Sequence, residues 1–340
     1  MRIEQAELRD AARQIMVGLG PTAGAEAAWE AIRDAGFPAL TAPEAFGGLQ
    51  QPLAAASWLY LELGHALSPA ALLPSLLAAA ALNALPPSAA RDEWLGRVAG
   101  GERIAVSLLD PTAADVQLGA DGALNGSVVA VQGTDAAEHA LIAGPALLAI
   151  VPLSALKVVP RQLWDVSRDL ADLVLSDVSG QVLAQGAEAD AAIAALSVHL
   201  HVAIAADSIG AADAILEQTV DYLRQRRQYD RPLAMFQALK HRCADMKTMI
   251  AAADALLSDH LATLEAGGGD PLTLARGAKS IASSTFRTVA EEAIQLHGGM
   301  GMTMEHPAHR YLKRALLNEH LASADDACDL AVADALLEQA

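Results

Sequence analysis

The stretch that decides the fold is QRRQYDRPLAMFQALKHR, residues 225–242. Two arginines, Arg226 and Arg227, and an aromatic, Tyr229, precede Pro232. A helix cannot run smoothly across Pro232, because proline lacks an amide donor and biases its predecessor away from helical angles. Apolar residues then return at helical spacing. The stretch therefore predicts a helix, a tight break and a second helix.

The basic residues in this stretch have two interpretations. A guanidinium fork beside an aromatic suits bidentate binding of a phosphate group. A basic helix end followed by a turn also stabilises the helix macrodipole without any ligand. On spacing alone the second interpretation is the simpler one, and both stay open at this point.

Two long motifs give the chain a family resemblance. The opening stretch resembles the R-x-Q-F-G-(K/R)-P-(I/L)-x-x-F-Q-x-(L/V)-(K/Q)-H signature of acyl-CoA dehydrogenases. Residues 295–314, QLHGGMGMTMEHPAHRYLKR, are similar to the family's Q-x-x-G-G-x-G-(Y/F)-x-x-E-x-P-x-x-R-x-x-R-D. They occur in the family's order and at about its spacing. The resemblance implies a helical N-terminal domain (1–102), a reduced, barrel-like middle β domain (103–188) and a C-terminal four-helix bundle (189–340).

Periodicity along the chain predicts the same mostly α fold with a small central β domain. Helical patterns fill the first hundred residues. Short runs rich in β-branched residues follow, separated by Asp-Gly and Asn-Gly turns; they lie at 104–109, 124–133, 140–144, 147–153 and 170–178. Long helical patterns at 191–224, 236–266 and 271–296, with further helical segments in 307–337, predict an antiparallel bundle.

Composition excludes several classes of protein. The formal net charge of -18 argues against nucleic-acid binding. The most apolar run, residues 66–85, is broken by Pro69 and Pro74 and is too short to span a bilayer, so we expect a buried helix and no membrane partner. Two cysteines, Cys243 and Cys328, form no disulfide framework. The charged, amphipathic N-terminus does not resemble a signal peptide, and we expect a cytoplasmic protein.

The middle domain departs from the family pattern. Members have T-E-P-x-x-G-S-D after the first strand and W-I-(T/S) on a later one, and these segments contact the flavin ring. Here residues 109–115 read LDPTAAD and residues 131–133 read VQG. The resemblance therefore implies a domain kept for packing, with an eroded platform for the flavin ring.

The catalytic base is also missing. In the family a glutamate takes the α proton of an acyl-CoA thioester while a hydride passes to the flavin, and general-base catalysis contributes about 10²–10⁴-fold. The two places where members carry this glutamate correspond to Ala322 and Leu200. Neither side chain can accept a proton, so we expect no catalytic residue on this chain.

Several other residues could replace the base. Asp207 lies about 10 Å along the same helix from Leu200, and Glu319 precedes Ala322 by three residues. Weaker candidates are Glu305, His199 and His201. The pairs His199 with His201 and His306 with His309 lack a third ligand, so we predict no metal site.

The other half of the flavin site is retained. In homotetrameric relatives a neighbouring subunit holds the pyrophosphate and adenosine of FAD. The matching residues here are Arg226, Tyr229, Gln237, Gln295, Gly298 and Gly299. Glycines let backbone amides approach a phosphate closely.

The resemblance therefore implies one subunit of a heteromeric acyl-CoA dehydrogenase that shares FAD with its partner. It is similar to the short, degenerate chain of α2β2 enzymes that dehydrogenate steroid-CoA side chains. A homologous catalytic subunit would supply the glutamate, with an acyl-CoA substrate and an electron-transfer flavoprotein as acceptor. The alternatives are a self-sufficient homotetramer with a relocated base and a non-enzymatic scaffold that binds acyl-CoA.

Overall fold

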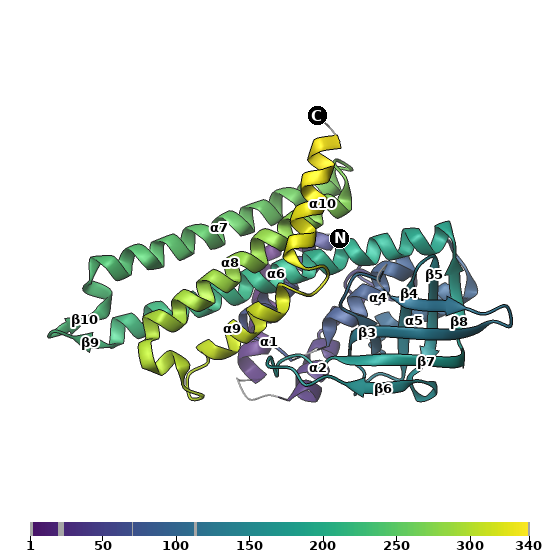
Figure 1. Ribbon diagram of the computed structural model, residues 1–340, viewed down its shortest axis with the longest axis horizontal. Helices are drawn as coiled ribbons and strands as arrows, with labels where there is room; N and C mark the ends of the chain where they lie inside the picture. Colours follow the sequence, from purple (N-terminus) through teal and green to yellow (C-terminus); the bar gives the residue numbers. More distant parts are fainter. Residues whose placement is uncertain (1–2, 20–23, 70, 112–113, 339–340) are drawn as a thin grey trace. The chain divides into compact units, whose positions relative to one another are not determined.

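The computed structural model describes residues 3–19, 24–69, 71–111 and 114–338 (Figure 1). Contacts within the chain group it into two units, Met1–Ala56 with Pro69–Leu200, and Ser57–Ser68 with His201–Ala340. Thr112 and Ala113, which fall in the degenerate ring-contacting motif, lie outside the described residues.

The first unit begins with helices, as the periodicity predicts. They are α1 (Gln5–Leu19), α2 (Ala25–Asp34), α4 (Leu72–Ala84) and α5 (Ala89–Ala99), with short 3-10 turns η1 (Phe37–Ala39) and η2 (Glu44–Phe46). Helix α3 (Leu53–His65) contributes its second half to the second unit. Most of α4 is buried, which confirms the interpretation of the apolar run as a core helix.

An eight-stranded mixed sheet follows these helices. Its strands are β1 (Ile104–Ser107), β2 (Asp115–Leu118), β3 (Ala123–Gln132), β4 (His139–Gly144), β5 (Leu147–Pro152), β6 (Lys157–Pro160), β7 (Ala171–Ser179) and β8 (Gln181–Gln185). The order is β6-β7-β3-β1-β4-β5-β8, with β2 paired to β3. Only β1 and β4 pair in parallel among the described strands. The predicted central β domain is thus confirmed.

The sheet is held by an aliphatic core and by links to the N-terminal helices. Alternate residues of the strands form one buried cluster that includes Leu124, Ile142 and Leu173. The indole Nε1 of Trp94 in α5 donates to Oε1 of Gln181 in β8 at 2.9 Å. Aliphatic side chains therefore carry most of this core, as the low aromatic content of the sequence requires.

The second unit is a helical bundle. Its elements are α6 (Ala187–Gln225, from residue 201 onward), the hairpin β9 (Arg227–Gln228) and β10 (Arg231–Pro232), η5 (Leu233–Met235), α7 (Gln237–Glu265), α8 (Pro271–His297), η6 (Gly298–Met302), α9 (Ala308–Asn318) and α10 (Asp325–Glu338). The predicted helices are present, and a loop at 319–324 divides the last predicted segment into α9 and α10.

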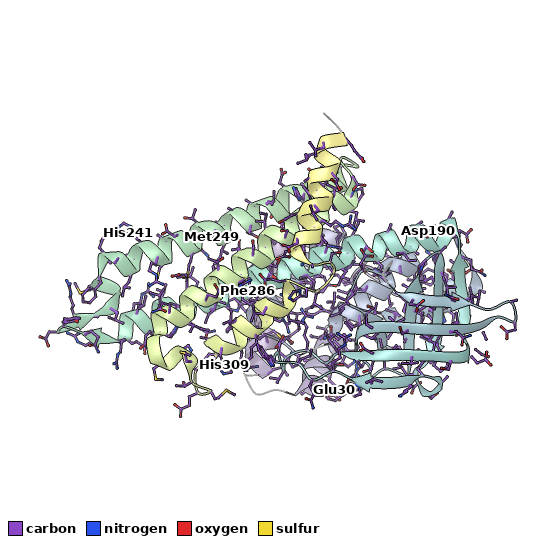
Figure 2. The ribbon with its side chains drawn as sticks, in the orientation of Figure 1. Glu30, Asp190, His241, Met249, Phe286 and His309 are labelled. Atoms are coloured by element: carbon purple, nitrogen blue, oxygen red, sulfur yellow. The ribbon has the colours of Figure 1, made fainter. Side chains whose placement is uncertain are left out.

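The bundle packs through narrow apolar stripes. On α7 the buried residues recur every three or four positions, at Met246, Ile250, Ala253, Leu257 and Leu261. Phe286, labelled on α8 in Figure 2, is fully buried. Asp270 caps α8, because its Oδ2 accepts the amide of Thr273 at 2.8 Å.

Helices α3 and α6 approach each other at two glycines. A Cβ atom on Gly210 would lie 1.9 Å from the carbonyl oxygen of Leu61, and one on Gly64 would lie 2.1 Å from that of Asp207. Neither carbonyl can move cheaply, since both belong to helical backbone. Glycine is therefore required at both positions of this crossing.

Helix α6 is long and apolar enough, by length and composition alone, to cross a membrane. However, 83% of its most apolar window is buried within the protein. This burial is what a core helix of a bundle shows.

Candidate functional site

The break at Pro232 is a two-residue hairpin that follows α6 directly. Gln228 pairs with Arg231, and Tyr229 and Asp230 turn the chain with positive φ angles of 51° and 62°. The Tyr229 side chain is 87% exposed. The hairpin thus presents an aromatic ring to the outside at the end of α6.

Arg226 stands between α6 and this hairpin and is exposed. Its guanidinium makes no hydrogen bond or ion pair within the part of the chain that the structure describes. By contrast, Arg227 donates to the carbonyl of Asp230 at 2.5 Å, and Arg231 lies 4.0 Å above the Phe236 ring. Of the three arginines, Arg226 has neither a hydrogen bond nor a ring contact among the described residues, so its donors are available for a ligand.

The Gln295–Gly299 turn is the second part of the site. Gln295, Gly298 and Gly299 are exposed at the end of α8. Gly298 has φ 60°, and a Cβ on either glycine would meet no atom within 4 Å. By contrast, a Cβ on Gly301 would lie 2.8 Å from the carbonyl oxygen of Ile294. Gly301 is therefore needed for packing, whereas the backbone at 298–299 faces open space.

The six predicted flavin-binding residues lie at one end of the bundle. Figure 1 shows the β9–β10 hairpin, the start of α7 and the end of α8 at this end. Gln237, the first residue of α7, is exposed. Its side-chain Nε2 lies 3.2 Å from Nε2 of His241, which Figure 2 labels. The Tyr222 hydroxyl donates to the carbonyl of His297 at 3.3 Å, which joins the end of α6 to the end of α8.

This donor set fits part of a dinucleotide. A free guanidinium matches a pyrophosphate, and an exposed ring offers a stacking surface for adenine. The Gly298 amide already donates to the carbonyl of Gln295, so this glycine offers close approach rather than a free donor. The residues therefore fit the half of FAD that lies away from the flavin ring.

The two positions predicted to correspond to the family's base carry no acid. Leu200 and Ala322 are buried, with exposures of 0% and 1%. Ala322 has a left-handed backbone with φ 61°. The loop around it is held by Lys279, a fully buried lysine that donates to the carbonyls of Glu319 (2.9 Å) and Ser323 (2.6 Å) and to Asp325 (2.6 Å).

Asp207 belongs to a buried ion pair. Arg314 donates to both of its carboxylate oxygens, at 2.9 and 3.1 Å, and the amide of Asn318 donates to it at 2.8 Å. A carboxylate that accepts three such bonds is stabilised as the anion. Asp207 is thus a weak proton acceptor, and its contacts argue for a structural role.

Two of the other candidate bases, Glu319 and His201, have hydrogen-bond partners. Glu319 accepts from Arg287 at 3.1 and 3.3 Å. The ring of His201 lies 3.3 Å from the Ser323 hydroxyl, and burial lowers the pKa of His199 to about 4. Glu305 is exposed in the segment that precedes α9. Among the described residues, no group of three His, Cys, Asp or Glu side chains could hold a metal ion.

Side chains of the same domain contact the polar groups of residues 132 and 133, in the segment that departs from the family pattern. The Gly133 amide donates to Oδ2 of Asp169 at 3.0 Å. Gln132 is buried, and its side-chain oxygen lies 3.5 Å from a guanidinium nitrogen of Arg168. Burial, and then the hydrogen bond and charge of Asp135, raise the pKa of Asp169 to about 6.

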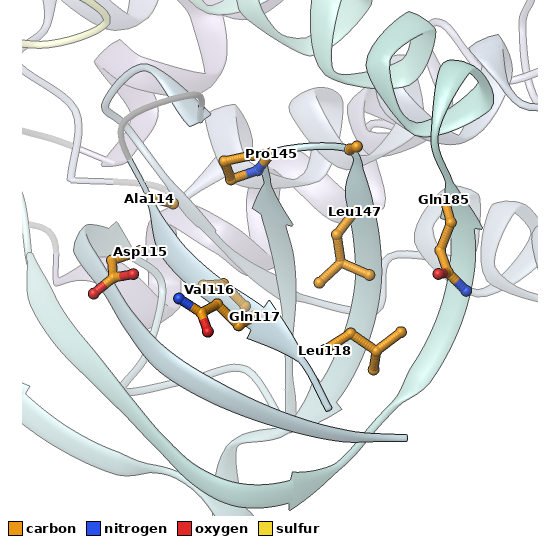
Figure 3. A pocket seen from close by; sticks show the side chains of 9 residues that line it. Ala114, Asp115, Val116, Gln117, Leu118, Pro145, Leu147 and Gln185 are labelled. Carbon is orange, nitrogen blue, oxygen red and sulfur yellow. The ribbon is translucent and has the colours of Figure 1, made fainter. Parts of the chain in front are cut away.

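Two hollows lie apart from these residues. One, of about 460 Å³, opens beside β2, between Val116, Leu118 and the β4–β5 turn (Figure 3). The other, of about 380 Å³, lies between α6 and α7 and is lined by Leu216, Val220 and Cys243 among others. None of the predicted site residues lines either hollow.

The sequence reasoning missed Lys279 and Asp169. Lys279 lies on the apolar face that the periodicity of α8 predicts to be buried. This was the available signal, because a buried lysine needs hydrogen-bond acceptors. Asp169 carried no signal, because its partner amide depends on how the end of β3 and the segment before β7 meet.

Comparison with known proteins identifies the family of the chain. Sequence models of the acyl-CoA dehydrogenase N-terminal and C-terminal domains match residues 3–102 and 191–336. The chain therefore belongs to the acyl-CoA dehydrogenase family, whose members are flavoprotein oxidoreductases acting on CH–CH bonds. Structures of this fold are known with bound FAD or FADH2.

Particular relatives follow from the same comparison. Acyl-CoA dehydrogenase IpdE2 of Mycobacterium tuberculosis is 34% identical over 291 residues, covering 85% of this chain and 80% of the relative. A variant of the Tcur3481–Tcur3483 steroid acyl-CoA dehydrogenase superposes with a TM-score of 0.87 at 27% identity, over 98% of both chains. The ChsE4–ChsE5 complex from Mycobacterium tuberculosis shares the fold at 22% identity and a TM-score of 0.87, over 98% of this chain and 97% of that one.

Proposed function

We propose that this chain is the non-catalytic subunit of a heteromeric acyl-CoA dehydrogenase and lends half of an FAD site to a homologous catalytic partner. One asymmetry carries the proposal. The guanidinium of Arg226 has no partner among the described residues, whereas the Gly133 amide is occupied by Asp169. The chain thus offers donors for a cofactor at one place and has closed the other.

The reaction assigns a limited role to this chain. FAD, when bound, accepts the hydride that leaves the β carbon of the acyl thioester. Arg226 would neutralise and orient the pyrophosphate, the exposed turn at Gly298 and Gly299 would let it approach the backbone closely, and Tyr229 would cover the adenine. The proton at the α carbon would go to a glutamate of the partner, because Ala322 and Leu200 cannot accept it.

The relatives indicate a steroid-CoA thioester as the substrate. A relative at 27% identity is a steroid acyl-CoA dehydrogenase whose designation joins two gene products, and a structure of the same fold is a complex of ChsE4 with ChsE5. We extend both properties, a steroid substrate and a second subunit, to this chain. An electron-transfer flavoprotein is the proposed acceptor, and the cytoplasm the proposed location.

The alternatives have less support. A self-sufficient enzyme needs a relocated base, but Asp207 and Glu319 are each bound to an arginine. A scaffold that only binds acyl-CoA could use Arg226 on the pyrophosphate of coenzyme A, so the measurement of bound flavin separates it from the proposed subunit.

Flavin stoichiometry tests the proposal. In an α2β2 tetramer only the pairing of the partner's ring platform with Arg226 and Gln295 of this chain is complete. We therefore expect two FAD per tetramer, and neither flavin nor turnover for this chain expressed alone. The measurement is released FAD absorbance against mass from light scattering, with an acyl-CoA assay using an artificial electron acceptor. Four flavins per tetramer, or a yellow, active homo-oligomer of this chain, would contradict the proposal.

A further inference from the structure

A group of three rings in tilted contact (the stack) adjoins the proposed flavin-binding turn. The His297 ring contacts Tyr222 of α6, at a centroid distance of 4.6 Å and an interplanar angle of 32°, and His306, at 4.1 Å and 47°. The His297 side chain is almost completely buried. It occupies the position between Gln295 and Gly298, so the stack is built into the turn itself.

The hydrogen bonds of the two imidazoles require both to be neutral. Nδ1 of His297 donates to the carbonyl of Ala293 at 2.7 Å, and its Nε2 is buried without a hydrogen-bond partner. A second proton would thus create a buried, unsatisfied N–H. Nδ1 of His306 accepts the amide of Ala308 at 3.2 Å, at the start of α9. A proton on that nitrogen would break the bond and bring a positive charge to a helix N-terminus.

The groups around the stack oppose protonation as well. Helix α6 contributes the uncharged phenol of Tyr222. Helix α9 contributes His309, which Figure 2 labels, and the cations Arg310 and Lys313 act on His309. Burial lowers the pKa of His297. Burial, and then the neighbouring His297 and His309, lower the pKa of His306.

The stack is mechanically joined to the turn. The Tyr222 hydroxyl fixes the carbonyl of His297, and the next peptide leads into Gly298 with its positive φ. A Cβ on Gly301 would also lie 3.0 Å from the Cβ of His297, so η6 folds back against this side chain. Separation of the rings would therefore displace the backbone amides at 298 and 299.

We propose that His297 and His306 position the flavin-binding turn as a neutral stacked pair, and that their protonation in mild acid releases the turn and weakens FAD binding. The inference rests on the proposed function, because it concerns the same turn. His297 is a positioning residue: it acts on the cofactor through Gly298 and Gly299 and does not contact it.

Two variants separate titration from packing. His297→Phe keeps an aromatic ring in the stack but cannot be protonated. His306→Asn keeps a side-chain acceptor for the Ala308 amide and likewise cannot be protonated. The control is His260→Asn, which removes a histidine bound to the Leu274 carbonyl between α7 and α8, far along α7 from the hairpin.

The experiment measures the FAD dissociation constant of the purified complex between pH 7.5 and 5.5, by fluorescence of released FAD. We expect affinity to fall several-fold over this range in the unmodified complex and the control, and by clearly less in His297→Phe and His306→Asn. The affinity of each variant is compared with its own value at pH 7.5. A pH-independent affinity, or variants that follow the unmodified curve, would overturn the inference.

A second readout does not depend on FAD. In the full-length chain alone, proton NMR should show the His297 and His306 ring signals titrating below the ordinary value of 6.5. His297→Phe should raise the midpoint of His306, because a neighbouring imidazole is removed. Titration of both rings at the ordinary value would overturn the inference. Failure of the proposed function is distinguishable, since Arg226→Ala would then leave FAD affinity at pH 7.5 unchanged.

Discussion

The end of the bundle and the end of β3 differ in whether their hydrogen-bond donors have partners within the chain. At the bundle end, Arg226 and Tyr229 are exposed, and the backbone of Gly298 and Gly299 faces open space. At the end of β3, the Gly133 amide and the Gln132 amide group are engaged by Asp169 and Arg168. The donors of the proposed flavin-binding end are exposed, whereas those at the end of β3 are bonded to side chains of their own domain.

The difference shows how a binding surface is lost without loss of the fold. Backbone donors in a buried or half-buried position need acceptors. Once a ligand no longer supplies them, a carboxylate from the same domain can do so, as Asp169 does. Exposed donors such as Arg226 have water as an alternative, so Arg226 can stay exposed with or without a ligand, and its use by FAD is tested by substitution.

The largest expected effect is a loss of stability on substitution in the interior of the bundle, away from its exposed end. Arg314→Met leaves the buried Asp207 carboxylate without its guanidinium, and breaking a buried pair in this way costs about 3–5 kcal/mol. Urea unfolding followed by circular dichroism measures the change. The double variant Arg314→Met with Asp207→Leu is the control and should recover most of the loss. A single-variant loss below about 1 kcal/mol would show that this pair does not hold α6 to α9.

The next effect concerns the exposed end. Arg226→Ala should remove a charge-assisted hydrogen bond worth about 1.5–3 kcal/mol, which corresponds to a fall of about 10–150-fold in FAD affinity of the complex. The free energy of unfolding should stay unchanged, since the side chain makes no contact that the bundle needs. Arg224→Ala, two residues earlier and paired with Asp221, is the matched control and should retain FAD. Equal FAD affinity in both variants would return Arg226 to the role of a helix-terminal cation.

The smallest effect concerns the closed site at the end of β3. The raised pKa of Asp169 means that the folded state favours the protonated acid, so stability is lost as pH rises from about 4 to 6. Asp169→Asn preserves an acceptor for Gly133 and removes the repulsion from Asp135. Because the pair is partly solvated, we expect a gain of about 1 kcal/mol at pH 8 and none at pH 4.5. Urea unfolding at both pH values measures it, and an equal change at both would exclude a role for this charge.

Much of the fold followed from periodicity and motifs. The long helices α6, α7 and α8 were predicted to within a few residues because their apolar spacing is sustained and glycine or proline marks their ends. Strands β2, β6 and β8 were not predicted individually. Strand β6 is a largely exposed edge strand and β8 is rich in glutamine, so neither shows an apolar run.

The candidate site was predictable only where a motif fixes it. The six flavin-binding residues came from the family signatures, and their roles remain predictions. The partners of Asp207 and Gly133 could not be predicted, because Arg314 and Asp169 lie 107 and 36 residues away along the chain. Contacts of this kind depend on tertiary packing, which local sequence patterns do not encode.

The loop held by Lys279 has a consequence for attempts to restore an active site. Ala322 already adopts a left-handed backbone, so a glutamate there would add little backbone strain beyond what alanine tolerates. Its carboxylate would nevertheless replace a methyl group that is 99% enclosed, and the adjacent lysine already has three acceptors. Burial without a cationic partner raises the pKa of a carboxyl group, so that it stays protonated. A single substitution at residue 322 would therefore not supply a base. The space around this residue would have to open before a glutamate there could ionise.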